Sequence, residues 1–334
     1  MRSWLIGAAL TVAACAATNG AELAQTSDPA SPSSYAPVDP QRLSEWMRTL
    51  GSDEFQGRAP GTDGERRTIA YLVEQFRAVG LEPGGENGAW TQRVPLIRTQ
   101  VPGSAGFTVR SHGATVAWRS PQDIYVSTVR ETDRVRIADA PMVFVGYGVT
   151  APERQWDDFG EVDLTGKVAV FLVNDPDFEA AAGDPVAGRF GGRAMTYYGR
   201  WTYKFEEAAR RGAIGALVVH ETEGAGYGWN TVQAPAGENY NIVLGQGAQQ
   251  PVLLQGWIQR EAAADLLRRA GHDFDMVKRQ ARTTGFQPID LGATFSADLP
   301  VTVERVESFN VIGRLPGAQR PDETIMFSGH WDAY

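Results

Sequence analysis

The stretch Thr324-Ile-Met-Phe-Ser-Gly-His-Trp-Asp-Ala-Tyr334 is an apolar run that leads through Gly329 to a histidine and an aspartate. The apolar part, Thr324 to Ser328, predicts a β-strand. Side chains two positions apart on an extended backbone point the same way, so such a strand would present His330 and Asp332 together. Imidazole is a common zinc ligand, and a neighbouring carboxylate can orient it. Taken alone the pattern is weak evidence, because His and Asp pairs are common on protein surfaces.

Upstream of this stretch, the sequence predicts an α/β protein. A first helix is expected after the cap Asp39, with Pro40 in its first position and an apolar stripe of Leu43, Trp46, Met47 and Leu50. A second helix has Thr62 and Glu65 as a capping box and ends at Gly80. Its predicted buried stripe is Ile69, Leu72, Val73 and Phe76.

Short β-rich runs follow, among them 107–110 and 115–118, which predict hairpins or a sheet edge. From residue 127 to residue 282 the pattern predicts a small α/β unit. Its expected strands are 142–145, 168–173 and 213–219, and its expected helices are 205–211 and 261–270, closed by Gly212 and Gly271. A strand over Phe309 to Leu315 then precedes the motif that carries His330.

Several blocks, taken in order, resemble metallopeptidase family twenty-eight, the co-catalytic zinc aminopeptidases and their relatives. These blocks are residues 53–62, 80–83, 90–96, 310–313 and 328–332. The unit at 127–282 looks like the protease-associated domain of larger members, on residues 146–148, 164–168 and 203–212. The expected layout is a signal at 1–25, a linker at 26–38, the start of a peptidase domain at 39–126, the protease-associated insert at 127–282, and the catalytic core from 283 to 334.

The resemblance implies a partial zinc-exopeptidase core, a mixed sheet with helices, and two zinc ions in the full-length enzyme. His330 would be a ligand of one zinc, and Asp332 a catalytic-site carboxylate that tunes it without binding the metal. The other family ligands and the general base are expected after Tyr334, so the chain is expected to be a C-terminally truncated, inactive fragment. Many relatives have a histidine where this chain has Ala333, a position that is not a ligand. The implied activity is aminopeptidase first and carboxypeptidase second, on peptide substrates.

The N-terminus predicts export, because Arg2 precedes a short apolar run from Leu5 to Ala14. Cys15, the only cysteine, directly follows Val-Ala-Ala, which resembles the lipobox of bacterial lipoproteins. Two outcomes stay open. Cys15 becomes lipidated and anchors a periplasmic protein in the outer membrane, or an ordinary signal is cut near Ala21 and the protein is secreted. Membrane association is expected only through that lipid.

Other chemistries have less support in the sequence. The net charge of -9 gives no basic footprint for nucleic acid, and no Gly-x-Ser-x-Gly elbow is present. The glycines at 146–148 are expected to form a turn rather than a dinucleotide site. The acidic loops 156–158 and 174–177 are expected to be solvated turns, with a hard cation as the alternative. His112, His220 and His272 are expected to be non-catalytic.

One cluster and one alternative function stay open at this stage. The aromatic cluster 197–201 is compatible with a substrate cleft or with packing at a domain boundary. The alternative to a peptidase is a non-catalytic module that binds peptides or proteins through its protease-associated domain.

Overall fold

The computed structural model describes residues 38–333, so the predicted signal, Cys15 and most of the linker lie outside the described residues. The chain divides into two compact units, one ending at Gly51 and the other starting at Ser52. Within residues 38–333, no helix is long and apolar enough to cross a membrane.

The first unit contributes helix α1 (Pro40–Leu50). The Asp39 carboxylate accepts a 2.9 Å hydrogen bond from the Gln41 amide, as the sequence predicts for an N-cap. No side chain of α1 is buried, and Met47 is 67% exposed. Of the predicted apolar stripe, Leu43 and Met47 are exposed, whereas Trp46 and Leu50 are half-buried.

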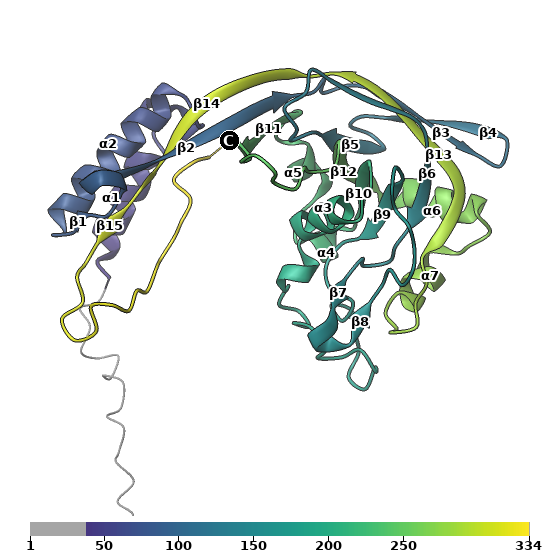
Figure 1. Cartoon of the computed structure of the whole chain (residues 1–334). Coiled ribbons are helices and arrows are strands. Elements are labelled where there is room, and N and C mark those ends of the chain that lie inside the picture. The colour runs from purple at the N-terminus through teal and green to yellow at the C-terminus, as the bar shows by residue number, and fades with distance from the viewer. Residues whose placement is uncertain (1–37, 334) are drawn as a thin grey trace, which may run out of the picture. The chain divides into compact units, whose positions relative to one another are not determined.

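The second unit is built on an eight-stranded mixed sheet in the order β4-β3-β13-β6-β9-β10-β12-β5 (Figure 1). Its strands are β3 (Gly106–Ser111), β4 (Ala114–Arg119), β5 (Ile124–Ser127), β6 (Arg134–Phe144), β9 (Val168–Leu172), β10 (Gly215–His220), β12 (Leu254–Gln259) and β13 (Ile289–Pro300). The central strands β6, β9, β10 and β12 run parallel, whereas the flanking pairs are antiparallel. The predicted α/β class is confirmed.

Helices pack on both faces of the parallel strands, which explains why β9 and β10 are apolar at nearly every position. Alternate residues of β9 face two separate cores: Val170 lies in one and Phe171 in the other. Helix α3 (Trp201–Arg210) covers the second core, and α6 (Arg260–Arg269) and α7 (Phe274–Gln280) cover the first. The helix predicted at 205–211 thus begins four residues earlier, at Trp201.

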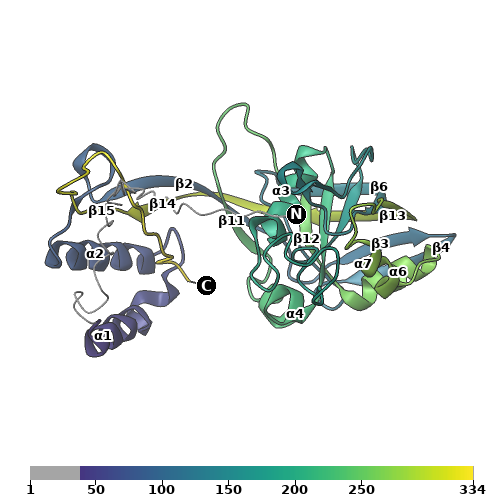
Figure 2. The ribbon, with the colours of Figure 1, turned by 90° about the horizontal axis from the view of Figure 1, so that it is seen from below.

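A second sheet has three strands in the order β11-β2-β14, with β11 (Glu238–Ile242), β2 (Thr91–Gln100) and β14 (Thr302–Val311) all antiparallel. Strand β14 continues from β13 after a break at Val301, so this ribbon takes part in both sheets (Figures 1 and 2). Helix α2 (Asp63–Ala78) packs beside β14. Two-stranded pairs join β1 (Glu82–Pro83) to β15 (Gly313–Arg314) and β7 (Thr150–Ala151) to β8 (Trp156–Asp157). Short helices complete the list: α4 (Thr222–Ala225), α5 (Trp229–Gln233), η2 (Asp53–Arg58), η3 (Glu86–Gly88), η4 (Pro152–Arg154) and η5 (Tyr197–Gly199).

The strand pairing does not divide at residues 127 and 282, where the sequence predicts the borders of an insert. Strand β5 pairs with β12, and β13 pairs with both β3 and β6. Strands from both sides of the predicted unit therefore complete its sheet. The division into a peptidase domain and an inserted domain stays a prediction.

One predicted strand is wrong. Residues Thr324 to Ser328 form no strand, and the side chains of Ile325, Met326 and Phe327 are 82%, 82% and 93% exposed. The physical reason is pairing: β14 is bonded only to β2 in its sheet, and no described strand lies against 324–328. An apolar β-prone sequence without a neighbouring strand has no partner for its backbone groups.

Two local predictions are confirmed at chain turns. Gly80 lies in the left-handed region, with φ of 82°, and its amide bonds to the Arg77 carbonyl at the end of α2. Gly146 and Gly148 also have positive φ values, 59° and 60°, and the chain continues into the short strand β7 rather than into an α-helix. The segment is a turn, and the dinucleotide-binding alternative has no structural basis.

Candidate functional site

His330 and Asp332 are brought together, although not on a strand. The Asp332 Oδ1 lies 2.8 Å from the His330 Nδ1, and the histidine side chain is 91% exposed while the aspartate side chain is 23% exposed. The carboxylate accepts, so Nδ1 carries the hydrogen and Nε2 presents its lone pair elsewhere. This is the orientation in which a carboxylate prepares an imidazole for a metal.

The residue between them anchors this pair to the fold. The Trp331 carbonyl accepts a 2.8 Å hydrogen bond from Arg58 Nε, and the Trp331 indole N–H donates to the Phe309 carbonyl at 3.1 Å. Arg58 belongs to the block 53–62 and Trp331 to the block 328–332, and Phe309 directly precedes the block 310–313. Hydrogen bonds therefore connect three parts of the chain that carry the family resemblance. Sequence reasoning gave Arg58 and Trp331 no individual role, because their contacts join residues 273 and 22 positions apart and no local pattern predicts such contacts.

The turn that carries Arg58 is conformationally unusual. Gln56, Gly57 and Arg58 have φ values of 49°, 72° and 61°, all in the left-handed region. Non-glycine residues adopt this conformation at a cost, which the surrounding contacts must offset. The bond from Arg58 to Trp331, which joins positions 273 apart, is one such contact.

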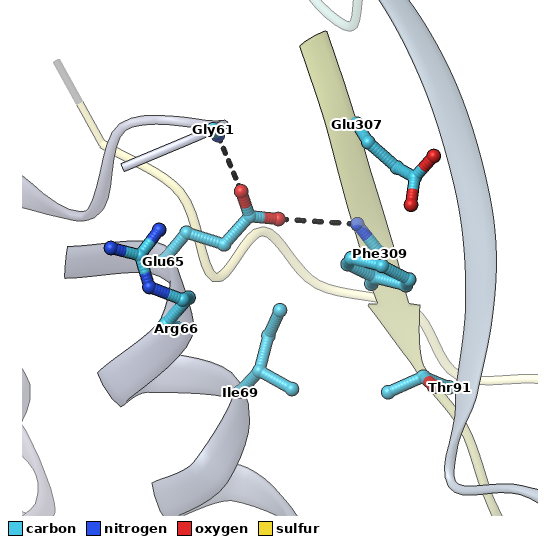
Figure 3. Close-up of a pocket in the computed structure, with 7 residues that line it drawn as sticks. All are labelled: Gly61, Glu65, Arg66, Ile69, Thr91, Glu307 and Phe309. Atoms are coloured by element: carbon cyan, nitrogen blue, oxygen red, sulfur yellow. Dashed lines mark hydrogen bonds between the residues drawn. The ribbon is translucent and has the colours of Figure 1, made fainter. Parts of the chain in front are cut away.

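Glu65 links α2 to β14 beside this network (Figure 3). Thr62 caps the helix as predicted, by accepting from the Glu65 amide at 3.3 Å. The Glu65 carboxylate, however, accepts from the Gly61 amide rather than from the N-cap amide of Thr62. It also accepts from the Ser308 hydroxyl at 2.7 Å and from the Phe309 amide at 3.1 Å. The predicted capping residue is thus mainly a tertiary anchor, and it is only 3% exposed.

A cavity of about 360 Å³ lies next to Glu65, between α2 and the β2–β14 pair (Figure 3). It is lined by Gly61, Glu65, Arg66, Ile69, Thr91, Glu307 and Phe309. The stripe of α2, predicted to be buried, is only half-buried at Ile69, Leu72, Val73 and Phe76. His330 and Asp332 do not line this cavity.

Among residues 38–333, no group of three or more His, Cys, Asp and Glu side chains is arranged to hold a metal ion. His220, expected to be non-catalytic, is a core residue that is 4% exposed and packs edge-on against Trp229 and Trp257. Its Nε2 lies 3.0 Å from the Tyr227 carbonyl oxygen. Burial lowers the pKa of His220, although the Tyr227 carbonyl and Glu221 act in the opposite direction.

In the acidic loops, expected to be solvated turns, three carboxylates are buried, those of Asp158, Asp175 and Asp177, whereas Asp157 is exposed. Asp158 accepts hydrogen bonds from the Val149 amide at 2.9 Å and the Trp156 indole at 2.8 Å, and Asp175 accepts from the Thr196 amide at 2.6 Å. These carboxylates bind backbone and side-chain donors around the turns. The predicted turn is confirmed at 176–177, whereas Trp156–Asp157 form strand β8. The prediction of solvation is wrong for Asp158, Asp175 and Asp177 and is confirmed for Asp157.

A buried lysine explains how this region tolerates several carboxylates. Lys204 is fully buried, and its ammonium group donates to the carbonyls of Tyr147 and Asn174. Burial lowers the pKa of Lys204 to about 8, although Asp175 and Asp158 oppose that shift. Burial raises the pKa of Asp158 to about 7. The cluster is a structural device that connects α3 to the turns after β6 and β9.

No family model and no curated protein matches the chain. Among solved structures, the chain is similar to the aminopeptidase from Aneurinibacillus sp. strain AM-1, with a TM-score of 0.36 and 16% identity over 84% of this chain and 49% of that one. It is also similar to BSAP, a zinc aminopeptidase from Bacillus subtilis, with a TM-score of 0.31 and 15% identity over 85% of this chain and 49% of that one. The chain therefore spans about half the length of these two proteins.

Proposed function

We propose that this chain is the N-terminal part of an exported, zinc-dependent metallopeptidase that removes N-terminal residues from peptides. The observation that carries the proposal is the His330–Asp332 hydrogen bond of 2.8 Å, which engages Nδ1 and leaves Nε2 for a metal. Supporting it, the anchoring contacts of Arg58, Trp331 and Phe309 connect blocks whose order resembles zinc aminopeptidases.

The described residues fit zinc in donor type but not in number. His330 offers an imidazole, whereas a catalytic zinc takes about three protein ligands and keeps one position open. No group of three possible ligands exists within residues 38–333. These residues therefore cannot hold the ion by themselves, and the proposal assigns the remaining ligands and the general base to residues after Tyr334.

The test compares the 334-residue chain with the longer product of its reading frame. Only the longer chain should hydrolyse aminoacyl-p-nitroanilides, and chelation of zinc should stop it. His330→Ala should abolish turnover, and Asp332→Asn should lower it about 10- to 100-fold, as for groups that orient a zinc-bound histidine. His272→Ala is the matched control. His272 is a half-buried histidine outside the motif that carries His330, and its replacement should leave turnover unchanged.

Three results would contradict the proposal. A stop codon directly after Tyr334 would remove the longer enzyme. Chelator-sensitive turnover by the 334-residue chain would show that the ligand count is wrong. Full activity of the longer His330→Ala variant would remove the ligand assignment.

Export belongs to the same proposal, with Cys15 lipidated and the protein held in the outer membrane facing the periplasm. The support is the cysteine directly after Val12-Ala-Ala14. Mass spectrometry of protein isolated from membranes should find an N-terminal lipid-modified cysteine. A mature N-terminus beyond Cys15 would instead indicate plain secretion.

A further inference from the structure

Residues 195–201 present large apolar side chains to solvent. Met195, Tyr197 and Trp201 are 36%, 53% and 41% exposed. Single exposed apolar residues are ordinary on protein surfaces, whereas several gathered together often mark an interaction site. Arg200, between the two aromatic residues, is exposed as well. These four residues are called the aromatic patch.

The backbone beneath the aromatic patch is held in place by buried groups. Asp175, which is fully buried, accepts hydrogen bonds from the Thr196 amide at 2.6 Å and from the Thr196 hydroxyl at 2.7 Å. A side chain at Gly199 would meet Asp175 Cγ at 2.9 Å, so the chain passes directly over this carboxylate. The buried carboxylate of Asp175 therefore holds the backbone of this loop in place.

The aromatic rings are also held by their neighbours. The Tyr197 ring lies edge-on against Tyr203 with centroids 5.4 Å apart, and its hydroxyl donates to Glu206. Trp201 lies edge-on against Phe205 at 5.6 Å. Exposed side chains that are already ordered lose little conformational entropy on binding, which favours affinity.

The positive charge of Arg200 indicates what kind of molecule would bind the aromatic patch. Within residues 38–333, Arg200 forms no ion pair with a carboxylate, whereas the nearby Arg193 is paired with Glu223 and Arg210 with Glu207. One free guanidinium does not make a nucleic-acid footprint on a chain of net charge -9. Trp, Tyr and Arg are the residues most enriched at the energetic centres of protein interfaces.

We infer that the aromatic patch is a docking surface for a polypeptide segment that carries a carboxylate next to a bulky apolar side chain. The carboxylate pairs with Arg200, and the apolar side chain packs on Tyr197 and Trp201. The inference rests on the geometry of this patch alone and is independent of the proposed zinc site, which involves other residues.

Fluorescence anisotropy of the purified chain tests this inference. The probes are fluorescein-labelled heptapeptides with a central Glu flanked by Phe, Leu or Trp, and their Gln counterparts. We expect saturable binding of Glu peptides and weaker binding of Gln peptides. Arg200→Met should weaken Glu-peptide binding roughly ten-fold, which corresponds to about 1.4 kcal/mol, and should not alter Gln-peptide binding.

The variants separate docking from folding. Trp201→Ala should weaken both peptide series, whereas Tyr197→Phe keeps the ring, loses only its hydroxyl bond to Glu206 and should weaken binding less than Trp201→Ala does. Arg279→Met and Met276→Ala, at exposed positions on α7, are the matched controls and should have no effect. Thermal unfolding confirms that each variant is folded. If Trp201→Ala does not fold, the comparison of Glu and Gln peptides with Arg200→Met still tests the inference.

Three outcomes would overturn the inference. The first is the absence of saturable binding by every Glu peptide. The second is equal binding of Glu peptides by the parent and by Arg200→Met. The third is a concentration-dependent dimer that Trp201→Ala converts to monomer in sedimentation, which would assign the patch to a second copy of the chain.

Discussion

At the scale of single residues, buried polar groups do most of the positioning in this protein. Lys204, Asp158 and Asp175 all lie inside the second unit and are satisfied by turns rather than by solvent. A buried charge is tolerated when hydrogen bonds and an opposite charge compensate its lost hydration. Of these residues, Asp175 holds the loop that carries the aromatic patch, because it accepts hydrogen bonds from Thr196.

His220 makes a prediction about pH at this scale. Burial lowers its pKa below the ordinary value of 6.5, so the unfolded chain takes up a proton at a higher pH than the folded chain does. The stability that His220 contributes is therefore complete above pH 6.5 and is lost as the pH falls toward its folded pKa. The loss is at most about 1.4 kcal/mol for each pH unit.

Urea unfolding of the parent and of His220→Gln between pH 7.5 and 5.5 measures this effect. The parent should lose more unfolding free energy than the variant over that range, because the variant lacks the titrating ring. Parallel curves for the two proteins would contradict the assignment. NMR titration of the His220 ring gives the folded pKa independently.

At the scale of elements, the attachment of α2 to β14 depends on one side chain. The Glu65 carboxylate accepts hydrogen bonds from Gly61, Ser308 and Phe309, while the apolar stripe of the helix is only half-buried. Burial of an apolar face usually supplies most of the stability of a packed helix. Here the polar link carries a larger share, because the apolar contact is incomplete.

Replacing Glu65 by Gln should therefore weaken this attachment. The glutamine NH2 group replaces one of the two carboxylate oxygens, and both oxygens accept hydrogen bonds in the parent. At least one donor among Gly61, Ser308 and Phe309 therefore loses its acceptor. We expect the free energy of unfolding to fall by about 1–3 kcal/mol, as for a buried hydrogen bond to a charged group. Glu74→Gln, at an exposed position of the same helix, is the control and should change it by less than about 0.5 kcal/mol. Equal effects of the two substitutions would show that the Glu65 contacts are dispensable.

At the scale of the whole molecule, the ribbon formed by β13 and β14 connects the two sheets of the second unit, and strand pairing crosses the predicted domain borders. Strand β13 lies in the eight-stranded sheet and β14, which continues from it, lies in the three-stranded sheet. Strands β3 and β5 complete the larger sheet from the N-terminal side. The first core of that sheet contains residues of β3, β5 and β13, including Phe107 and Phe295, which stack at 5.8 Å, and the second core contains Tyr125 of β5. Residues 127–282 therefore do not contain all of their own core.

Limited proteolysis tests this point. Chymotrypsin should first cut near Phe327, which is 93% exposed and outside any helix or strand. The fragment that resists longest should retain Phe107 at one end and Leu299 at the other, because both are buried in the first core. Mass spectrometry identifies its ends. A stable fragment trimmed to residues 127–282 would instead support a self-contained insert.

Local chemistry determined much of the fold from the sequence alone. The caps at Asp39 and Thr62 and the end of α2 at Gly80 were predictable because each depends on residues within one helical turn. The strands β9 and β10 were recognisable as short apolar runs. Strand β13 was missed, although its buried positions alternate from Leu291 to Leu299, a signal that was available.

Only the tertiary structure decided the contacts that the sequence left open, and it also corrected the strand predicted at 324–328. The partners of Glu65 lie 243 and 244 positions away, and Trp331 lies 273 positions from Arg58, so no local pattern announces either contact. The run 324–328 has the composition of a strand, but a strand also requires a neighbour to pair with, and no described segment supplies one. Composition determines which residues prefer extended backbone, whereas only the assembled sheet determines which of them are paired.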